Sequence, residues 1–219
     1  MKTDAEVLTE VNRLIDEYHP KAGLDSLSKF LLSFSALRHP SVKMHMARVA
    51  LIAHNAASNS DDLITPKPAF FGGLFHDIGK LVLPDYLFSG REVNEEEYAQ
   101  IKEHAVLGFE ALKDHHFYTA LCAGMHHAMG QTQGNSYGIN FYEQIIKTTL
   151  SPRTALRVLQ TSLLISIADF ADAFMSRKTT LRNTVQKDLK SMLIDKYGQD
   201  ANTIIDLVLD EANIIHGNN

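Results

Sequence analysis

Two observations predict an all-α protein. Apolar residues recur at helical spacing in successive segments, and no segment shows the two-residue alternation of a strand or an internal repeat. Hydrophobic residues make up 45% and charged residues 21% of the 219-residue chain, which is enough apolar content for a sizeable core. We therefore expect one domain, or one domain with a smaller helical extension.

Composition and charge exclude several classes of protein. The formal net charge of −5 gives no global attraction to nucleic-acid polymers or anionic membranes, so a phosphorylated substrate would have to be drawn by local charge. The single cysteine, Cys122, excludes an intrachain disulfide framework and a cysteine-based zinc site. The N-terminus carries acids where a signal peptide would be apolar, and no run of membrane-span length is expected. These features favour a cytoplasmic protein.

The first 38 residues predict a small helical extension. Residues 4–18 have apolar side chains at helical spacing, with Thr3 or Asp4 as N-cap. Pro20 and Gly23 end this segment, and a second helix is expected over residues 25–37, ending before Pro40 because a residue before proline disfavours helix. We assign residues 1–38 to the extension and 39–219 to the main domain.

A histidine lies on the apolar face of the next segment. Ser41 is the expected N-cap of a helix that runs to about residue 58. One face of this helix is apolar except for one imidazole, and consists of Val42, His45, Val49, Ile52 and Ala56. His45 is therefore expected to face the core, and His54 to face solvent.

The segment Phe70–Pro84, FFGGLFHDIGKLVLP, is an apolar run interrupted by His76, Asp77 and Lys80. We expect a helix from about residue 68 to residue 79. A buried charge or imidazole needs a partner, since burying it unpaired costs several kcal/mol. One metal ion would satisfy His76 and Asp77 together.

Two further helices are each expected to present histidine inward. Asn94 and Glu97 form a capping-box-like start, followed by one face with Ile101, His104, Gly108 and Ala111, and His115 and His116 close this helix. Residues 117–130 predict a short apolar helix ending in His126 and His127. The Gly- and Asn-rich segment that follows is expected to form a lid or rim.

Residues 152–176 predict a buried helix. Proline stands at its first position, and the segment is apolar nearly all round. Asp169 and Asp172 break this pattern on one side. The helices expected near 182–194 and 200–215 are amphipathic and structural.

Taken singly, each polar residue has an ordinary structural explanation. A lone histidine on an apolar face is more often a hydrogen-bonded core residue than a ligand, Asp172 could cap or bridge helices, and Lys80 could reach the surface. Taken together, four helices each present imidazole or carboxylate inward, and a fifth adds Asp169. Such nitrogen and oxygen sets suit Fe, Mn, Zn, Mg or Co, and helical bundles build metal sites in this way.

The order of these motifs resembles the HD-domain metal-dependent phosphohydrolases. The chain has H-x-x-R-V at His45, H-D-I-G-K at His76, a lone His104, the pair His126-His127, and D-x-x-D-A at Asp169. Within these proteins it looks most like the HD-GYP branch, whose members hydrolyse cyclic di-GMP. The resemblance covers roughly residues 40–185.

The resemblance implies an HD-domain helical bundle with a dinuclear metal site. His45, His76, Asp77 and Asp169 would bind one divalent ion, with Asp77 bridging, and His104, His126 and His127 would bind the second. Iron or manganese is favoured, with Zn, Mg, Co or Ni as alternatives. Asp77 and Lys80 would be catalytic, and a hydroxide bridging the metals would attack phosphorus. Candidate substrate-binding residues are Lys80, Tyr137, Asp172, Arg177 and Lys178.

Several positions depart from the HD-GYP pattern. The carboxylate that trinuclear members carry one turn before the first histidine is Ser41 here, which favours two metals. Ala128 replaces the glutamate of the HHE motif, and the loop Gly134-Asn135-Ser136-Tyr137-Gly138 lacks the GYP proline. The gap from the double histidine to Asp169 is also longer.

Three functional hypotheses follow. The first is a phosphohydrolase of a small nucleotide-type substrate, with a cyclic dinucleotide as one candidate. The second keeps the enzyme and makes it a nucleotide phosphatase. The third is a signalling or scaffold module without catalysis, as in the related HDOD domains. A homodimer is compatible with each of them.

Overall fold

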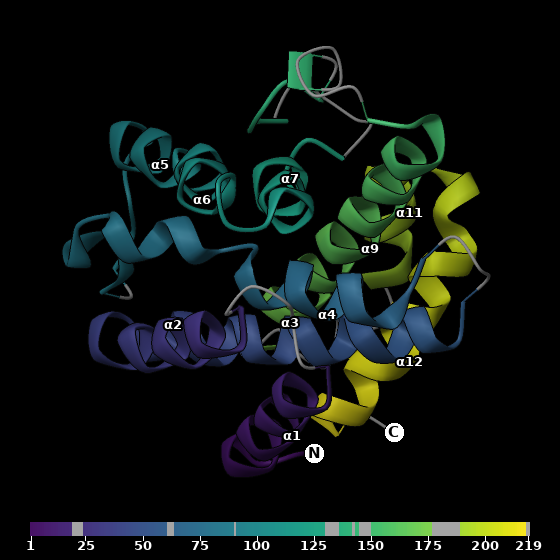
Figure 1. The fold of residues 1–219 in the computed structure, drawn as a ribbon, viewed down its shortest axis with the longest axis horizontal. Coiled ribbons are helices and arrows are strands. Elements are labelled where there is room, and N and C mark those ends of the chain that lie inside the picture. The colour runs from purple at the N-terminus through teal and green to yellow at the C-terminus, as the bar shows by residue number, and fades with distance from the viewer. Residues whose placement is uncertain are drawn as a thin grey trace.

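The computed structural model describes residues 1–18, 24–60, 64–89, 91–129, 136–141, 143–144, 150–176 and 189–217. Every regular element in these ranges is a helix, which confirms the all-α fold (Figure 1). The elements are α1 (Asp4–Tyr18), α2 (Leu24–Arg38), α3 (Pro40–Ser58), α4 (Pro66–Phe75), η2 (Ile78–Val82), η3 (Asp85–Phe88), α5 (Glu95–Lys102), α6 (His104–Leu112), α7 (Phe117–Met125), α9 (Pro152–Ser176), α11 (Leu189–Tyr197), η5 (Gln199–Ala201) and α12 (Asn202–His216).

The N-terminal helices share the core of the rest of the chain. Val7, Val11 and Leu14 on α1 and Leu32 on α2 are buried in the same apolar cluster as the α3 side chains. In Figure 1, α1 lies beside the C-terminal α12, and the backbone N–H of Lys2 donates to the carbonyl of Ile215 at 3.0 Å. The division at residue 38 remains a prediction.

Helix α3 starts two residues earlier than expected. His39 occupies the N-cap position and Pro40 the first turn, so Ser41 is not the cap. The proline has no N–H to lose at this position, which makes it a favourable first residue. His54 does not face solvent as expected. It is half-buried, and its Nε2 lies 2.7 Å from the Tyr18 hydroxyl.

Helix α4 ends at Phe75, four residues before the predicted end. His76 and Asp77 form a turn, and η2 follows as a short 3₁₀ helix. The apolar run conceals this end because the residues on both sides of it, Phe75 and Ile78, are buried. His76 and Asp77 thus lie between two helices, where a turn can aim both side chains at one point.

The segment after Asn94 forms two helices instead of one. The capping box between Asn94 and Glu97 is confirmed, and α5 ends at Lys102. Helix α6 begins at His104, so the helical phase changes and Ala111 is exposed instead of inward-facing. His104 is buried as expected.

His116 caps the following helix and does not close the preceding one. Its Nδ1 accepts from the backbone N–H of Thr119 at the start of α7. Burial, followed by the charge of Lys67, lowers the pKa of His116. An accepting nitrogen requires a neutral ring, which agrees with the lowered pKa, so the prediction that His116 closes the preceding helix is wrong.

Helix α9 is the long central helix that the sequence predicts. It is long and apolar enough to cross a membrane by length and composition, contrary to the expectation that no run would be. However, 61% of its most apolar window is buried inside the fold, which is the pattern of a core helix. Of the two predicted C-terminal helices, α11 covers residues 189–197 and α12 covers 202–216; residues 182–188 lie outside the described ranges.

Candidate metal centre

Three histidines of the candidate site lie at the ends of α4, α6 and α7. His76 follows the last residue of α4, His104 is the first residue of α6, and His126 follows the last residue of α7. All three side chains are essentially inaccessible to solvent. The sequence brings them together because each helix buries an apolar face up to its end.

The same local hydrogen bond orients each of these three imidazoles. In each, Nδ1 lies within hydrogen-bond distance of the carbonyl three residues earlier: 2.8 Å for His76 and Gly73, 2.6 Å for His104 and Ile101, and 2.8 Å for His126 and Ala123. A carbonyl oxygen only accepts, so Nδ1 of each ring carries a proton and Nε2 is the nitrogen that faces the centre. This is the outer hydrogen bond that metal-binding histidines commonly make.

The two oxygens of Asp77 face different histidines. Oδ2 lies 3.5 Å from Nε2 of His45 and 3.4 Å from Nε2 of His76. Oδ1 lies 3.2 Å from Nε2 of His104 and 3.9 Å from Nε2 of His126. Asp77 therefore stands between two sets of nitrogen atoms, as a carboxylate that bridges two ions would.

Asp77 is buried and incompletely satisfied. Lys80 Nζ lies 2.5 Å from its Oδ2, while Oδ1 has no hydrogen-bond partner among the described residues. Burial alone would raise the pKa of Asp77, but Lys80 and His76 hold it well below its usual range. A buried ionised oxygen without a hydrogen bond is what a bound cation would satisfy.

Asp169 completes the first set of side chains. Its Oδ1 lies 2.9 Å from Nε2 of His45 and 3.7 Å from Nε2 of His76. The inward position of Asp169 on α9 and of His45 on α3 agrees with the helical spacing in the sequence.

Asp172 lies one layer further from the centre. Its Oδ2 accepts from Nδ1 of His45 at 2.7 Å, and Arg48 donates to both of its oxygens at 2.7 and 3.0 Å. His216 Nε2, near the end of α12, donates to Oδ1 at 2.8 Å. Asp172 has no exposed surface. Its surroundings do not suit the predicted substrate contact, and we reassign it as a residue that orients His45.

His127 lies beside an aromatic ring from the following loop. The rings of His127 and Tyr137 stack at 4.4 Å with an angle of 26° between their planes. Gly138 reaches φ +122° and approaches α7 so closely that a Cβ there would lie 2.1 Å from the carbonyl of Gly124. This close approach helps to hold Tyr137 against His127, so Tyr137 lies at the site as predicted.

Protonation divides the histidines into two groups. Burial lowers the pKa of His76, but the carboxylates of Asp77 and Asp169 outweigh this effect and raise the pKa to about 10. On the other side, burial together with the neighbouring imidazoles holds the pKa of His126 well below its usual range. The pKa of His127 falls to about 3, mainly through burial. His126 and His127 are therefore neutral, as metal ligands must be.

The structure groups these side chains into sets that could hold a metal ion, with all ligand atoms of a set within 4.8 Å of one another. The three sets are Asp77, His104, His126 and His127; His45, His76 and Asp77; and His76, His126 and Asp169. Together they contain all seven predicted ligands. The donor atoms are imidazole nitrogen and carboxylate oxygen, which fit the divalent ions named above.

Sequence reasoning missed three residues that surround the site. Arg48 is the arginine of the H-x-x-R-V motif and had no predicted role, and His216 had no predicted functional role either. Lys196 on α11 lies 4.7 Å over the ring of Phe170, and Asp169 acts on its pKa, which burial lowers overall. Only the spacing of Arg48 from His45 gave a sequence signal, because His216 and Lys196 lie far along the chain.

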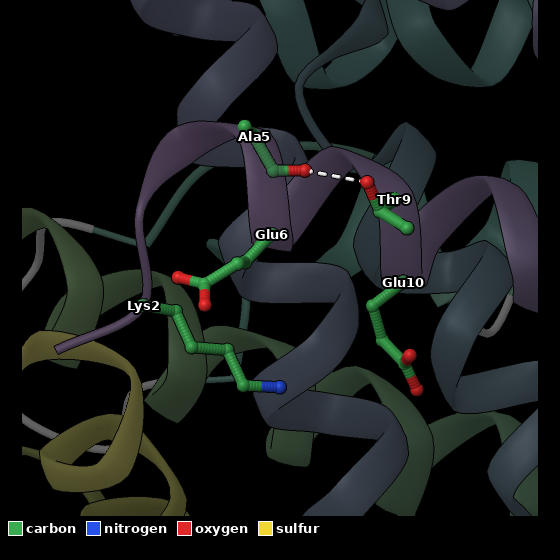
Figure 2. Close-up of a pocket in the computed structure, with 5 residues that line it drawn as sticks. All are labelled: Lys2, Ala5, Glu6, Thr9 and Glu10. Carbon is green, nitrogen blue, oxygen red and sulfur yellow. Dashed lines mark hydrogen bonds between the residues drawn. The ribbon is translucent and has the colours of Figure 1, made fainter.

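Other predicted residues and hollows lie elsewhere. Arg177, Lys178 and the loop residues Gly134 and Asn135 fall outside the described ranges. A surface hollow is lined by α1 and by Lys2, and Figure 2 shows Glu6 and Glu10 projecting there. Glu6 accepts from Thr3, and Glu10 is paired with Arg13. The hollow therefore holds surface pairs and no convergent chemistry.

The chain belongs to the HD domain family, which matches residues 42–176 and thus more than half of the sequence. Proteins with this domain are generally metal-dependent hydrolases, and the histidine–aspartate cluster lies within the fold that the family match covers. A comparison with curated proteins and one with solved structures gave no match.

Proposed function

We propose that this protein is a two-metal phosphohydrolase that cleaves a phosphoester of a small nucleotide-type substrate. The arrangement of Asp77 carries the proposal, since its two oxygens face two different sets of histidine Nε2 atoms. One divalent ion would be held by His45, His76, Asp77 and Asp169. The other would be held by Asp77, His104, His126 and His127.

The chemistry would be shared between the ions and the chain. Two divalent cations, with iron or manganese favoured and Zn, Mg, Co or Ni as alternatives, activate water and neutralise charge at phosphorus. Asp77 keeps its negative charge because the ammonium group of Lys80 stabilises it. His126 and His127 stay neutral and keep their lone pairs available.

Lys80 is the described cation best placed to meet a substrate phosphate. Its Nζ contacts Asp77 at 2.5 Å, and its side chain is 18% exposed, so it reaches from the buried carboxylate toward the surface. An ammonium there would neutralise phosphate oxygens by charge-assisted hydrogen bonds. Tyr137 would line the pocket, and Arg177 and Lys178 are further candidates for the same task.

A cyclic dinucleotide is our first candidate substrate, and a nucleoside monophosphate or triphosphate is the second. The first rests on the resemblance of the ordered motifs to the HD-GYP branch. The second takes account of the altered loop around Tyr137. A nucleic-acid polymer or a membrane surface is not expected as a partner, because the net charge of −5 would repel both.

Elemental analysis followed by a hydrolysis screen tests this function. We expect close to two equivalents of metal per chain and turnover of at least one substrate in a panel of cyclic dinucleotides and nucleotides. His76→Ala and Asp77→Asn should abolish both metal binding and turnover. His54→Gln, which alters a histidine outside the cluster, is the matched control and should keep both.

Two outcomes would contradict the proposal. If Asp77→Asn hydrolysed the substrate at the wild-type rate, the cluster would not be the catalytic centre. If the protein bound metal tightly but hydrolysed nothing in the panel, the signalling or scaffold hypothesis would replace the enzyme.

A further inference from the structure

One side of the candidate metal centre reaches the surface at His127. His127 and Tyr137 are half-buried, whereas His76, His104 and His126 are buried. The stacked rings of His127 and Tyr137 thus lie where the centre meets solvent. A substrate larger than its reacting phosphate can extend past this edge, so the side chains next to Tyr137 are candidates for holding the rest of it.

Lys102 contacts two tyrosine rings at this edge. It is the last residue of α5, two positions before the predicted ligand His104. Its Nζ lies over the ring of Tyr98, 4.7 Å from the ring centre, and over the ring of Tyr137 at 5.7 Å. Burial raises the pKa of Tyr137 and Tyr98 adds to the rise, so the two tyrosines lie near each other. Because Tyr98 is 47% exposed and Lys102 only half-buried, a solute can reach the ammonium.

The charge of Lys102 is not neutralised by its neighbours. Aromatic rings attract an ammonium through their quadrupole but carry no net charge. Among the described residues no carboxylate pairs with Lys102, whereas Lys80 contacts Asp77 and Arg48 contacts Asp172. The positive charge of Lys102 is therefore available to an anion from outside, and the two rings fix its position.

We propose that Lys102 and Tyr98 form a subsite for a second phosphate group of the substrate, apart from the phosphate at the metal ions. This inference rests on the proposed function, which supplies the phosphorylated substrate. Lys102 would bind the second phosphate by charge-assisted hydrogen bonds, and Tyr98 would position Lys102. Lys102 meets the centre through Tyr137 and contacts none of the seven predicted ligands. The second phosphate would thus be attached at another atom of the sugar, or on a second sugar, and not joined directly to the first.

Equilibrium binding tests the subsite without catalysis. The probes are phosphonate analogues of adenosine 3′,5′-bisphosphate and adenosine 5′-monophosphate, which share a base and cannot be hydrolysed. In isothermal titration with Mn²⁺ present, the wild type should bind the bisphosphate analogue at least about tenfold more tightly, the scale of a hydrogen bond to a charged group. Lys102→Met keeps the side-chain length and removes the charge, so it should abolish this preference and leave binding of the monophosphate analogue unchanged. Lys102→Arg should retain the preference.

Matched variants separate the subsite from general charge and from folding. Lys113→Met removes the same charge at the far end of α6, where Lys113 pairs with Glu110, and should keep the preference. Tyr98→Phe keeps the ring and should also keep it. Tyr98→Ala releases Lys102 and should reduce the preference severalfold. Circular dichroism confirms that each variant is folded.

Steady-state kinetics gives a second measurement. For a substrate with a second phosphate, Lys102→Met should raise KM and leave kcat unchanged, because the lost contact is made equally in the ground state and the transition state. A wild type that hydrolyses no substrate would contradict the proposed function, while the binding comparison would still test the subsite.

Three binding results would overturn this inference. One is a wild type that binds the two analogues equally. Another is a preference that survives in Lys102→Met, since another group would then hold the second phosphate. The third is an equal loss in Lys113→Met, which would assign the preference to the overall charge of the protein.

Discussion

Oδ2 of Asp172 lies 2.7 Å from Nδ1 of His45, while the other nitrogen of that imidazole faces the candidate metal centre. A carboxylate in this position fixes the ring orientation and makes the opposite nitrogen a better donor to metal. Arg48 and His216 hold Asp172 in turn. Because His216 lies on α12, this network connects the C-terminal helix to the candidate metal centre.

Asp172→Asn should lower metal affinity by about 10- to 100-fold, the usual effect of losing such an outer carboxylate. Competition with a chelating metal indicator measures the change. Ser58→Ala on α3 is the control, because its hydroxyl donates to the carbonyl of His54, outside this network. Unchanged affinity in Asp172→Asn would show that Asp172 does not orient His45.

Gly79→Ala should damage the site through a backbone collision. A Cβ at residue 79 would lie 2.0 Å from the carbonyl oxygen of His104, and backbone cannot move aside as a flexible side chain can. Gly108→Ala is the matched control, since its Cβ would meet nothing closer than 3.4 Å. Within a helix, that change should stabilise the fold by up to about 1 kcal/mol. Thermal unfolding separates the two, and equal melting temperatures would contradict the prediction.

Metal should stabilise the fold by satisfying the buried Oδ1 of Asp77. At a free metal concentration of about 100 Kd, binding adds about 2.7 kcal/mol. For a chain of this size, that corresponds to a rise in Tm of roughly 5–11 °C. Scanning calorimetry with Mn²⁺ and with a chelator measures it. Asp77→Asn should show no metal-dependent shift, and a shift equal to that of the wild type would place the bound ion elsewhere.

The cap made by His116 should be sensitive to acid. Its folded-state pKa lies below the ordinary value of 6.5, so its contribution is present above that pH and is lost as the pH falls below it. His116→Asn keeps a good N-cap that does not titrate. Urea denaturation at about pH 7.5 and about pH 5.5 should show a larger loss of stability in the wild type than in the variant. Equal losses would mean that His116 does not cap as a neutral ring.

Tyr137 should act on His127 through its ring and not through its hydroxyl. Tyr137→Phe keeps the stacked ring and should retain metal affinity. Tyr137→Ala removes it and should weaken binding severalfold, in line with about 0.5–1.5 kcal/mol for an aromatic pair. Isothermal titration compares them. A loss of turnover in Tyr137→Phe with unchanged metal affinity would instead assign the hydroxyl to the substrate.

The sequence predicts best what depends on local spacing. The capping box of Asn94 and Glu97 is a contact between near neighbours, and the inward direction of His45 follows from the period of α3. The end of α4 was misplaced because the turn at His76 is as buried as the helix before it. Because the turn is buried, the pattern of polar and apolar residues does not show where the backbone leaves the helical conformation.

Contacts between distant segments could not be predicted. His216 binds Asp172 across 44 residues, and nothing near either residue signals the pairing. The role of His116 was misassigned because a cap belongs to the helix that follows, and the position of that helix start was ambiguous. Tyr137 was placed at the site by resemblance alone, since its stacking on His127 depends on the loop conformation at Gly138.

The hydrogen bonds from Nδ1 of His76, His104 and His126 have a consequence for protein design. Each ring is anchored to a carbonyl of its own chain segment, three residues earlier, so its direction is fixed without help from the rest of the fold. Such a four-residue segment, a histidine with the carbonyl that orients it, could be transferred to another protein as one metal-binding element. Grafted onto the helix ends of an unrelated bundle, three copies would need only to be brought to a common point to create a new metal-binding scaffold.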